Sequence, residues 1–304
     1  MFDTTPMLDC NGRVLALDRA RVVGIVNVTP DSFSGDGLSP DAAIAHGLKL
    51  VAEGADALDI GGESTRPGAE EIPIEEELRR VIPVIERLAR EADVPVWIDT
   101  SKAEVMRAAV GAGAGLINDV YALRRDGAMD AAAELKVPVV LMHMQGEPRT
   151  MQDAPDYDDV VADVHRFLAE RIFACEMSGV SKKKIVVDPG FGFGKTLGHN
   201  LALLRQLARF TDLGVPVLAG LSRKGMIGTL TDRAQSLPRT RSGGDRVYGS
   251  VAAALIAAQH GAKLLRVHDV AATVDALKVW NAVAAQTVPK GKSGSSTPKW
   301  GDDD

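Results

Sequence analysis

The sequence predicts an α/β protein made of a single (β/α)8 TIM barrel, and three observations lead to that fold class. Short runs rich in Val, Ile and Leu alternate with segments whose apolar residues recur at three- and four-residue spacing. Eight such strand and helix patterns follow one another, the number that closes a parallel barrel. The length of 304 residues suits one barrel, and 45% hydrophobic but only 4% aromatic residues suits a core of small aliphatic side chains.

The predicted elements alternate along the chain in a regular order. Strands are predicted at residues 21–27, 57–60, 94–99, 115–118, 137–143, 184–188, 215–219 and 263–268. Helices are predicted at residues 41–53, 75–90, 102–110, 126–135, 157–177, 200–210, 249–260 and 271–284. An open, doubly wound sheet is the competing fold. It would usually carry a glycine-rich turn after its first strand, whereas residues 27–30 read Asn-Val-Thr-Pro.

The two ends of the chain are predicted to lie outside the eight repeats. Residues 7–17 alternate around Asn11-Gly12, a strong hairpin signal, so residues 1–19 are expected to form an N-terminal β-hairpin that closes the bottom of the barrel. Residues 1–288 are taken as the barrel domain with this hairpin. Residues 289–304 are rich in Lys, Gly and Ser and then acidic, and we expect a disordered tail there.

Charge and cysteine content narrow the partners and the compartment. A formal net charge of -6 argues against a general nucleic-acid or anionic-membrane surface. Cys10 and Cys175 have no metal-type spacing, and both are expected to be reduced, structural thiols. Asp3 and Asp9 interrupt the N-terminal apolar residues, so no signal peptide is predicted, and no apolar run is long enough for a membrane span. A cytoplasmic location is expected.

Polar residues follow the predicted strands, where a barrel of this kind places its active site. Carboxylates and amides there suit the edge of a flat, nitrogen-rich heterocycle, and cationic side chains suit a phosphate or diphosphate. An Asp at a strand end can instead cap the next helix, as Asp99 could do, but capping does not explain the whole set. The set comprises Asn27, the loop 61–68, Asp99, Asn118, Asp119, His143, Asp188, residues 222–224, Arg266 and His268.

Five motifs in this order resemble bacterial dihydropteroate synthase, over residues 20–285. Residues 27–34 read Asn-Val-Thr-Pro-Asp-Ser-Phe-Ser, and 59–68 read Asp-Ile-Gly-Gly-Glu-Ser-Thr-Arg-Pro-Gly. Residues 188–195 read Asp-Pro-Gly-Phe-Gly-Phe-Gly-Lys, followed by Ser-Arg-Lys at 222–224 and Arg-Val-His-Asp-Val at 266–270. The first two motifs also resemble pterin-binding methyltransferases. The resemblance implies condensation of 6-hydroxymethyl-7,8-dihydropterin diphosphate with 4-aminobenzoate, which releases diphosphate and forms 7,8-dihydropteroate.

The resemblance also implies a role for each matching residue. Catalysis is implied for Asp99, Lys224 and Arg266. Pterin binding is implied for Asp99, Asn118, Asp188, Lys224 and Arg266, and diphosphate binding for Asn27, Thr65, Arg66, Arg266 and His268. Asn27 would also hold Mg2+ on the diphosphate, and Phe33, Pro67, Phe193 and Ser222 would contact the aminobenzoate. The family implies a homodimer.

The chemistry implied is substitution at the exocyclic methylene of the pterin, with early departure of diphosphate. The arylamine attacks directly, so no nucleophilic side chain is required, and Asp99 is placed to favour the developing cation. Two other functions stay open at this point: a pterin-dependent methyltransferase on the same barrel, and a catalytically silent pterin-binding relative. Arg66, Arg266 and His268 favour a diphosphate substrate, which methyl transfer does not need.

Overall fold

Eight parallel strands form the centre of the protein in a computed structural model that describes residues 6–29, 39–65, 68–231 and 246–285. They lie in the order β8-β7-β6-β5-β4-β3-β10-β9. Most are only four or five residues long and buried on both faces, as parallel strands under helices must be. The strands are β3 Arg21–Asn27, β4 Ala57–Gly61, β5 Val96–Asp99, β6 Leu116–Asp119, β7 Val139–Met142, β8 Ile185–Asp188, β9 Leu218–Ala219 and β10 Leu264–Val267.

The sheet closes on itself between its first and last strands. Val187 of β8 forms a parallel bridge with Val217, the residue before β9. The backbone N–H of Val187 also donates to the carbonyl of Pro216 at 3.0 Å. These contacts join the two edges, so the predicted (β/α)8 barrel is confirmed.

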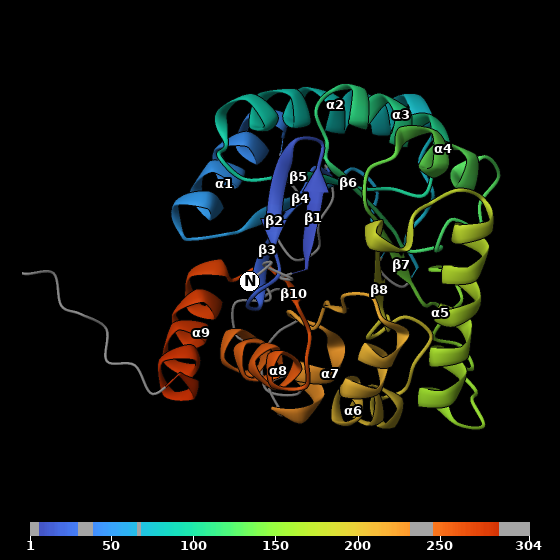
Figure 1. Cartoon of the computed structure of the whole chain (residues 1–304), viewed down its shortest axis with the longest axis vertical. Helices are drawn as coiled ribbons and strands as arrows, with labels where there is room; N and C mark the ends of the chain where they lie inside the picture. Colours follow the sequence, from blue (N-terminus) through green and yellow to red (C-terminus); the bar gives the residue numbers. More distant parts are fainter. Residues whose placement is uncertain (1–5, 30–38, 66–67, 232–245, 286–304) are drawn as a thin grey trace, which may run out of the picture.

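Helices surround the barrel, one after almost every strand, as Figure 1 shows. Side chains cap several of them: Ser39 accepts from the N–H of Ala42, and Asp159 accepts from those of Val161 and Ala162. The helices are α1 Pro40–Ala52, α2 Ile74–Glu91, α3 Ala103–Gly111, α4 Ala128–Leu135, α5 Val160–Met177, α6 Leu197–Arg205, α7 Gly225–Leu230, α8 Val247–Gln259 and α9 Val270–Ala284. The described part of the chain also has two 3-10 helices, η1 Lys182–Lys184 and η2 Leu207–Leu213.

The predicted helix at residues 200–210 differs from the structure. Here α6 begins earlier, at Leu197, because Thr196 and His199 form a capping box, and it ends at Arg205 before η2. The short helix α7 was not predicted, since its six residues include two glycines and have no apolar periodicity.

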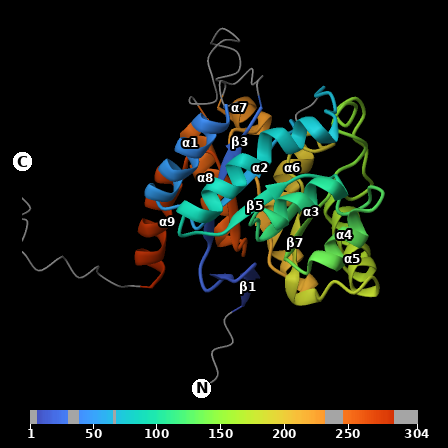
Figure 2. The same ribbon diagram turned by 90° about the horizontal axis from the view of Figure 1, so that it is seen from above.

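The N-terminal hairpin covers the bottom of the barrel, as predicted. Its strands are β1 Met7–Cys10 and β2 Arg13–Ala16, and Asn11 and Gly12 both adopt positive φ, the geometry of a tight hairpin turn. Figure 2 shows β1 at the end of the barrel opposite α7. Four hairpin residues share a buried layer with one residue from each barrel strand: Leu8, Cys10, Leu15 and Leu17 meet Val23, Ala57, Trp97, Leu116, Val140, Val186, Leu218 and Leu264.

Both cysteines are buried and unpaired, as predicted. Burial is the main cause that raises the pKa of the Cys10 thiol to about 12 and that of Cys175 to about 11. Both therefore stay protonated at neutral pH, where a thiol is a weak nucleophile. Within the described ranges, no helix is long and apolar enough to cross a membrane.

Candidate active site

The carboxyl ends of the strands bring together most of the residues predicted for the site. Each of these side chains lies within one residue of the last residue of a strand, so the barrel backbone fixes its position. They are Asn27 on β3, Asp99 on β5, Asn118 on β6, Asp188 on β8, and Arg266 and His268 at the end of β10. Phe33, Arg66 and Pro67 lie outside the described residues, as does the predicted tail at 289–304.

Arg266 is the centre of a buried polar cluster across four strands. Its Nε donates to Asp59 Oδ2 at 2.5 Å, and its Nη2 donates to Asp99 Oδ2 at 2.7 Å. Asn118 Nδ2 donates to the same Asp59 oxygen at 2.9 Å. Two carboxylates therefore hold the guanidinium plane in one orientation, which prepares its flat face for stacking on a ring.

Asp59 is a site residue that the sequence analysis missed. It is fully buried in the middle of β4, and its Oδ1 has no hydrogen-bond partner among the described residues. A buried, unsatisfied carboxylate oxygen next to a polar cluster marks a place for a bound molecule or water. A carboxylate within the apolar run at 57–60 was the available signal, because such residues are seldom fully buried without a function or a partner.

The electrostatic balance of the cluster gives Asp99 an unusual proton affinity. Burial raises the pKa of Asp99 to about 7; the positive charge of Arg266 lowers it, and the negative charge of Asp59 raises it further. For Arg266, burial lowers the pKa, but Asp59 and Asp99 more than compensate and raise it above the usual range. The arginine is thus always charged, while Asp99 changes charge near neutral pH.

Asp188 stands at the end of β8, against the glycine-rich turn that follows. Its Oδ1 accepts from the N–H of Gly190 at 2.7 Å. Its Oδ2 faces Gly220, where a side-chain Cβ would lie 3.8 Å from that oxygen. Burial raises the pKa of Asp188, and the Gly190 hydrogen bond and nearby Lys224 oppose that shift. One carboxylate oxygen is therefore anchored, and the other lies beside a residue that has no side chain.

Lys224 and Phe193 approach each other over this turn. Lys224 Nζ lies 4.1 Å from the centroid of the Phe193 ring, a cation–π contact. The Lys224 Cδ would lie only 3.2 Å from a Cβ at Gly192, whose φ is also positive, so a glycine lets the lysine stem cross the turn.

Ser222 and His268 are joined across the loops after β9 and β10. Ser222 Oγ accepts from the backbone N–H of His268 at 3.1 Å and lies 3.0 Å from its Nδ1. Next to them, Arg223 forms a two-point ion pair with Asp269, at 3.1 and 2.7 Å. The contact with Ser222 fixes the orientation of the His268 ring.

Lys195, like Asp59, is a buried residue for which the sequence predicted no role. Its Nζ lies 2.9 Å from His143 Nδ1 and donates to the carbonyl of Phe193 at 2.9 Å. Burial lowers the pKa of Lys195 to about 7, opposed by Asp188. Burial, with the charge of Lys195, also lowers the pKa of His143 to about 2, so its ring is neutral. This pair ties the glycine-rich turn to the end of β7.

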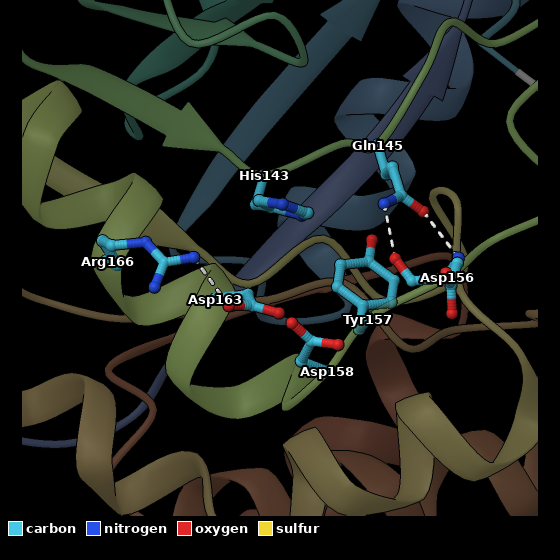
Figure 3. A pocket seen from close by; sticks show the side chains of 7 residues that line it. All are labelled: His143, Gln145, Asp156, Tyr157, Asp158, Asp163 and Arg166. Atoms are coloured by element: carbon cyan, nitrogen blue, oxygen red, sulfur yellow. Dashed lines mark hydrogen bonds and ion pairs between the residues drawn. The ribbon is translucent and has the colours of Figure 1, made fainter.

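A pocket of about 350 Å³ lies beside the connection from β7 to α5, as Figure 3 shows. Arg166 pairs with Asp163 at 2.7 Å, and Tyr157 donates to the carbonyl of Gly194 at 2.7 Å. Among the described residues, none that was predicted to bind pterin, diphosphate or aminobenzoate lines this pocket. Its lining is His143, Gln145, Asp156, Tyr157, Asp158, Asp163 and Arg166. His143, which follows β7 and belongs to the strand-end set, is the residue that this lining shares with that set.

Comparisons with known proteins agree with this geometry. Residues 23–268 match the family of pterin binding enzymes. The dihydropteroate synthase of Escherichia coli (strain K12) is 50% identical over 277 residues, which cover 90% of this chain and 95% of that protein. The structure of Xanthomonas albilineans dihydropteroate synthase with 4-aminobenzoic acid has a TM-score of 0.85 and 65% identity, covering 94% of this chain and all of that one (100%). The same enzyme in complex with 7,8-dihydropteroate gives 0.80 and 61%, with coverage of 94% and 100%.

The barrel, its strand-end cluster and the family match define the class: the chain belongs to the pterin-binding enzyme family. The identity to E. coli and X. albilineans proteins extends over nearly the whole of both chains. Within the family, the chain is therefore one of the dihydropteroate synthases, and the resemblance found in the motifs is confirmed.

Proposed function

We propose that the chain joins 6-hydroxymethyl-7,8-dihydropterin diphosphate to 4-aminobenzoate, releasing diphosphate and forming 7,8-dihydropteroate. The main support is the fixed strand-end cluster, in which acceptors for a ring and cations for a diphosphate meet. Related enzymes from X. albilineans have been solved with 4-aminobenzoic acid and with 7,8-dihydropteroate. Both of these molecules are components of the proposed reaction.

Asp188, Asn118 and Lys224 would bind the edge of the pterin ring. The free Oδ2 side of Asp188 can accept from the amino and ring N–H groups, since its Oδ1 is already used by Gly190. Asn118 can donate and accept, and Lys224 can donate to the carbonyl side of the ring. Arg266, held flat by Asp59 and Asp99, would stack on the ring face.

Catalysis would consist of stabilising charge on both sides of the breaking bond. The methylene carbon–oxygen bond breaks and its electron pair leaves with the diphosphate, while the arylamine nitrogen forms the new bond and then loses a proton. Electron release from the dihydropterin ring spreads the positive charge. Ionised Asp99 would stabilise that cation, and Arg266 and His268 would stabilise the leaving anion.

Asn27, Thr65, Arg66 and His268, with Arg266, would hold the diphosphate. A Cβ at Gly61 would lie 3.8 Å from both Asn27 Oδ1 and Asp99 Oδ2, so two oxygens face one small space without a side chain. Oxygen donors of this kind suit Mg2+, which Asn27 would hold together with diphosphate oxygens. When bound, the ion would balance the charge of the leaving group. Among the described residues, no group of three or more His, Cys, Asp or Glu side chains could hold a metal ion.

The aminobenzoate would lie above the pterin, near the loops. Phe193 would contact its ring together with Phe33 and Pro67, and Ser222 would lie near its carboxylate. The cation–π contact with Lys224 holds the Phe193 ring beside the pterin subsite. This arrangement places the arylamine next to the methylene carbon of the pterin.

A coupled assay for diphosphate release tests the proposed function. Release from the pterin diphosphate should require 4-aminobenzoate and should match the amount of dihydropteroate formed. A methyltransferase or a silent pterin-binding protein would release no diphosphate under these conditions. Binding of pterin without any aminobenzoate-dependent release would therefore overturn the proposal.

The order of binding is the first prediction from the site. Asp188, Asn118 and Arg266 are fixed at strand ends, so the pterin subsite should exist without ligand. The aminobenzoate subsite depends on loop residues and should form after the pterin and Mg2+-diphosphate bind. We expect 4-aminobenzoate affinity to rise by about 1–3 kcal/mol when both are present. Equilibrium titrations of free and saturated enzyme measure this, and equal affinities would show a preformed subsite.

A homodimer in the cytoplasm is the proposed working form. Free, unpaired cysteines suit a reducing compartment. Apolar side chains are exposed on the adjacent helices α8 and α9. Tyr248 on α8 is 80% exposed, and on α9 Val283 is 72% and Val279, one turn before it, 67% exposed. Exposed apolar surface of this kind favours a protein–protein contact.

The second prediction concerns that surface. Combined Val279→Glu and Val283→Glu substitutions should convert the dimer to a monomer, because charged side chains would have to be buried in the contact. Light scattering after size exclusion measures the mass. Phe173→Glu on α5, also an exposed apolar position at 65%, is the matched control and should leave the mass unchanged. A wild-type monomer, or a double variant that stays dimeric, would contradict the assignment.

A further inference from the structure

The connection between β4 and α2, residues 62–73, carries Thr65 and is closed at its base by one side chain. Lys102 Nζ donates to Glu63 Oε2 at 2.5 Å and to the carbonyl of Ile72 at 2.8 Å. The same Glu63 oxygen accepts from the N–H of Ile72 at 3.1 Å. Lys102, Glu63 and Ile72 therefore form a closed ring of contacts that joins the two ends of the loop. We call these three residues the loop clasp.

The clasp is attached to the rigid part of the barrel through a second carboxylate. Lys102 Nζ also donates to Glu77 Oε2 of α2 at 2.7 Å. Glu77 is only 1% exposed, whereas Glu63 on the loop is 16% exposed. Lys102 itself directly precedes α3, three residues after Asp99. The ammonium thus joins a scaffold carboxylate to a loop carboxylate, and all three of its hydrogens have acceptors.

Stability alone does not account for this arrangement. Lys102 is 7% exposed, and lysine is almost never buried without partners. A buried ion pair often stabilises no more than apolar side chains of similar size, because both charges lose their hydration. What the charges add is a defined geometry, since the ammonium must lie within hydrogen-bond distance of its three acceptors.

The start of the loop is fixed independently of the clasp. Arg80 Nη1 of α2 donates to the carbonyl of Gly62 at 2.9 Å. A Cβ at Gly62 would lie 2.6 Å from Val81 Cγ1, so only a glycine allows the loop to leave β4 this close to α2. Gly62 and Glu63 therefore leave the barrel along one path, and Thr65 follows two residues later.

We infer that Lys102 is a positioning residue that, through Glu63 and Ile72, holds both ends of this loop and thereby sets the position of Thr65 relative to the diphosphate. The inference rests on the proposed function, because Thr65 is assigned there to the diphosphate. Lys102 touches no ligand in this scheme. It fixes the position of Glu63, from which the chain continues to Thr65. The pterin subsite at the strand ends does not depend on Lys102.

Two chemically identical substitutions on the two sides of the ammonium separate positioning from stability. Glu63→Gln weakens the loop side, and Glu77→Gln weakens the scaffold side and is the matched control. Neither residue contacts a substrate in the scheme above. Steady-state kinetics should be measured well above pH 7, because Glu77 also raises the Asp99 pKa, which is about 7. Thermal unfolding and pterin binding are measured for the same proteins.

The inference predicts different results for the two variants. Glu63→Gln should raise the KM for the pterin diphosphate about five- to tenfold, the difference between a charge-assisted and a neutral hydrogen bond, with affinity for a pterin that lacks the diphosphate unchanged. Glu77→Gln should lower the melting temperature at least as much as Glu63→Gln does, and its KM for the same substrate should stay within about twofold of wild type. Equal KM changes in both variants, or none in Glu63→Gln, would overturn the inference.

Hydrogen exchange provides a test that needs no catalytic activity. The Ile72 amide donates to Glu63, so peptides covering residues 64–72 should exchange faster in Glu63→Gln than in Glu77→Gln. Equal exchange rates would show that the clasp does not hold the loop. If wild-type protein released no diphosphate, the proposed function would fail, but this exchange result would still decide whether the clasp exists.

Discussion

Replacing Asp188 by alanine is expected to weaken binding of the pterin about 10- to 150-fold while the barrel remains folded. Asp188 is the buried carboxylate assigned to the ring N–H groups, and it is 6% exposed. Removing a charged acceptor leaves buried donors unpaired, which costs about 1.5–3 kcal/mol, or about 10- to 150-fold in affinity. The isosteric Asp188→Asn variant should lose affinity as well. Its NH2 group, in place of one carboxylate oxygen, is a donor and cannot accept from the ring N–H groups. Calorimetric titration with the pterin diphosphate measures the loss.

Asp119 provides the matched control for this experiment. It is an equally buried strand-end carboxylate, but its oxygens accept from the N–H groups of Tyr121 and Leu123, both at 2.8 Å. Asp119→Asn should therefore lower stability and leave pterin affinity nearly unchanged. Undiminished affinity in Asp188→Ala, or equal losses in the Asp188 and Asp119 variants, would contradict the assignment of Asp188.

Asp99→Asn is expected to lower kcat/KM for the pterin diphosphate about 10²- to 10³-fold and to remove a pH dependence. Because the pKa of Asp99 is raised to about 7, chiefly by burial, its stabilising negative charge is present above that pH and lost below it. In wild type, kcat/KM should therefore rise with pH through about 7 and then level off, and a pH–rate profile measures this. The asparagine variant should lack the rise.

The same titration affects stability in a defined direction. The folded protein keeps the Asp99 proton up to about pH 7, whereas the ordinary value for an unfolded Asp is 3.8. The contribution of this group to the free energy of unfolding is thus fully present below pH 3.8 and is lost as pH rises through about 7.

Asp56→Asn is the control for the pH–rate profile. Asp56 lies at the opposite end of the barrel and is paired with Arg21. It should keep the wild-type pH–rate profile, and a changed profile there would assign the titration elsewhere.

The fold was largely predictable because its signals are local. Each strand is a short apolar run, and each predicted strand overlaps an observed one, with the hairpin at Asn11-Gly12 also in place. The misplaced α6 and the missed α7 have local causes as well. The capping box of Thr196 and His199 makes α6 begin earlier than predicted. The two glycines within Gly225–Leu230 made α7 unrecognisable as a helix from its sequence.

The site was predictable only where family motifs or strand ends marked it. Asp59 lies in the middle of a strand, and its contacts with Arg266 and Asn118 join residues far apart in sequence. Lys102 likewise meets Glu63 and Glu77 at separations of 39 and 25 residues. The closed barrel brings these side chains together. The spacing of apolar residues along the chain reports only local structure, so it could not predict these contacts. The roles assigned to all the site residues, those of Phe33, Arg66 and Pro67 included, stay predictions.

The N-terminal hairpin is synthesised before the strands that it covers, but it can complete the core only after the last of those strands is present. Pairing between Met7–Cys10 and Arg13–Ala16 is local and can form early in synthesis. The apolar layer that receives Leu8 and Leu15 needs a residue from every barrel strand, ending with Leu264. A growing chain that stops short of Leu264 therefore exposes an unfinished apolar layer, the kind of surface that chaperones bind and that aggregates when left uncovered.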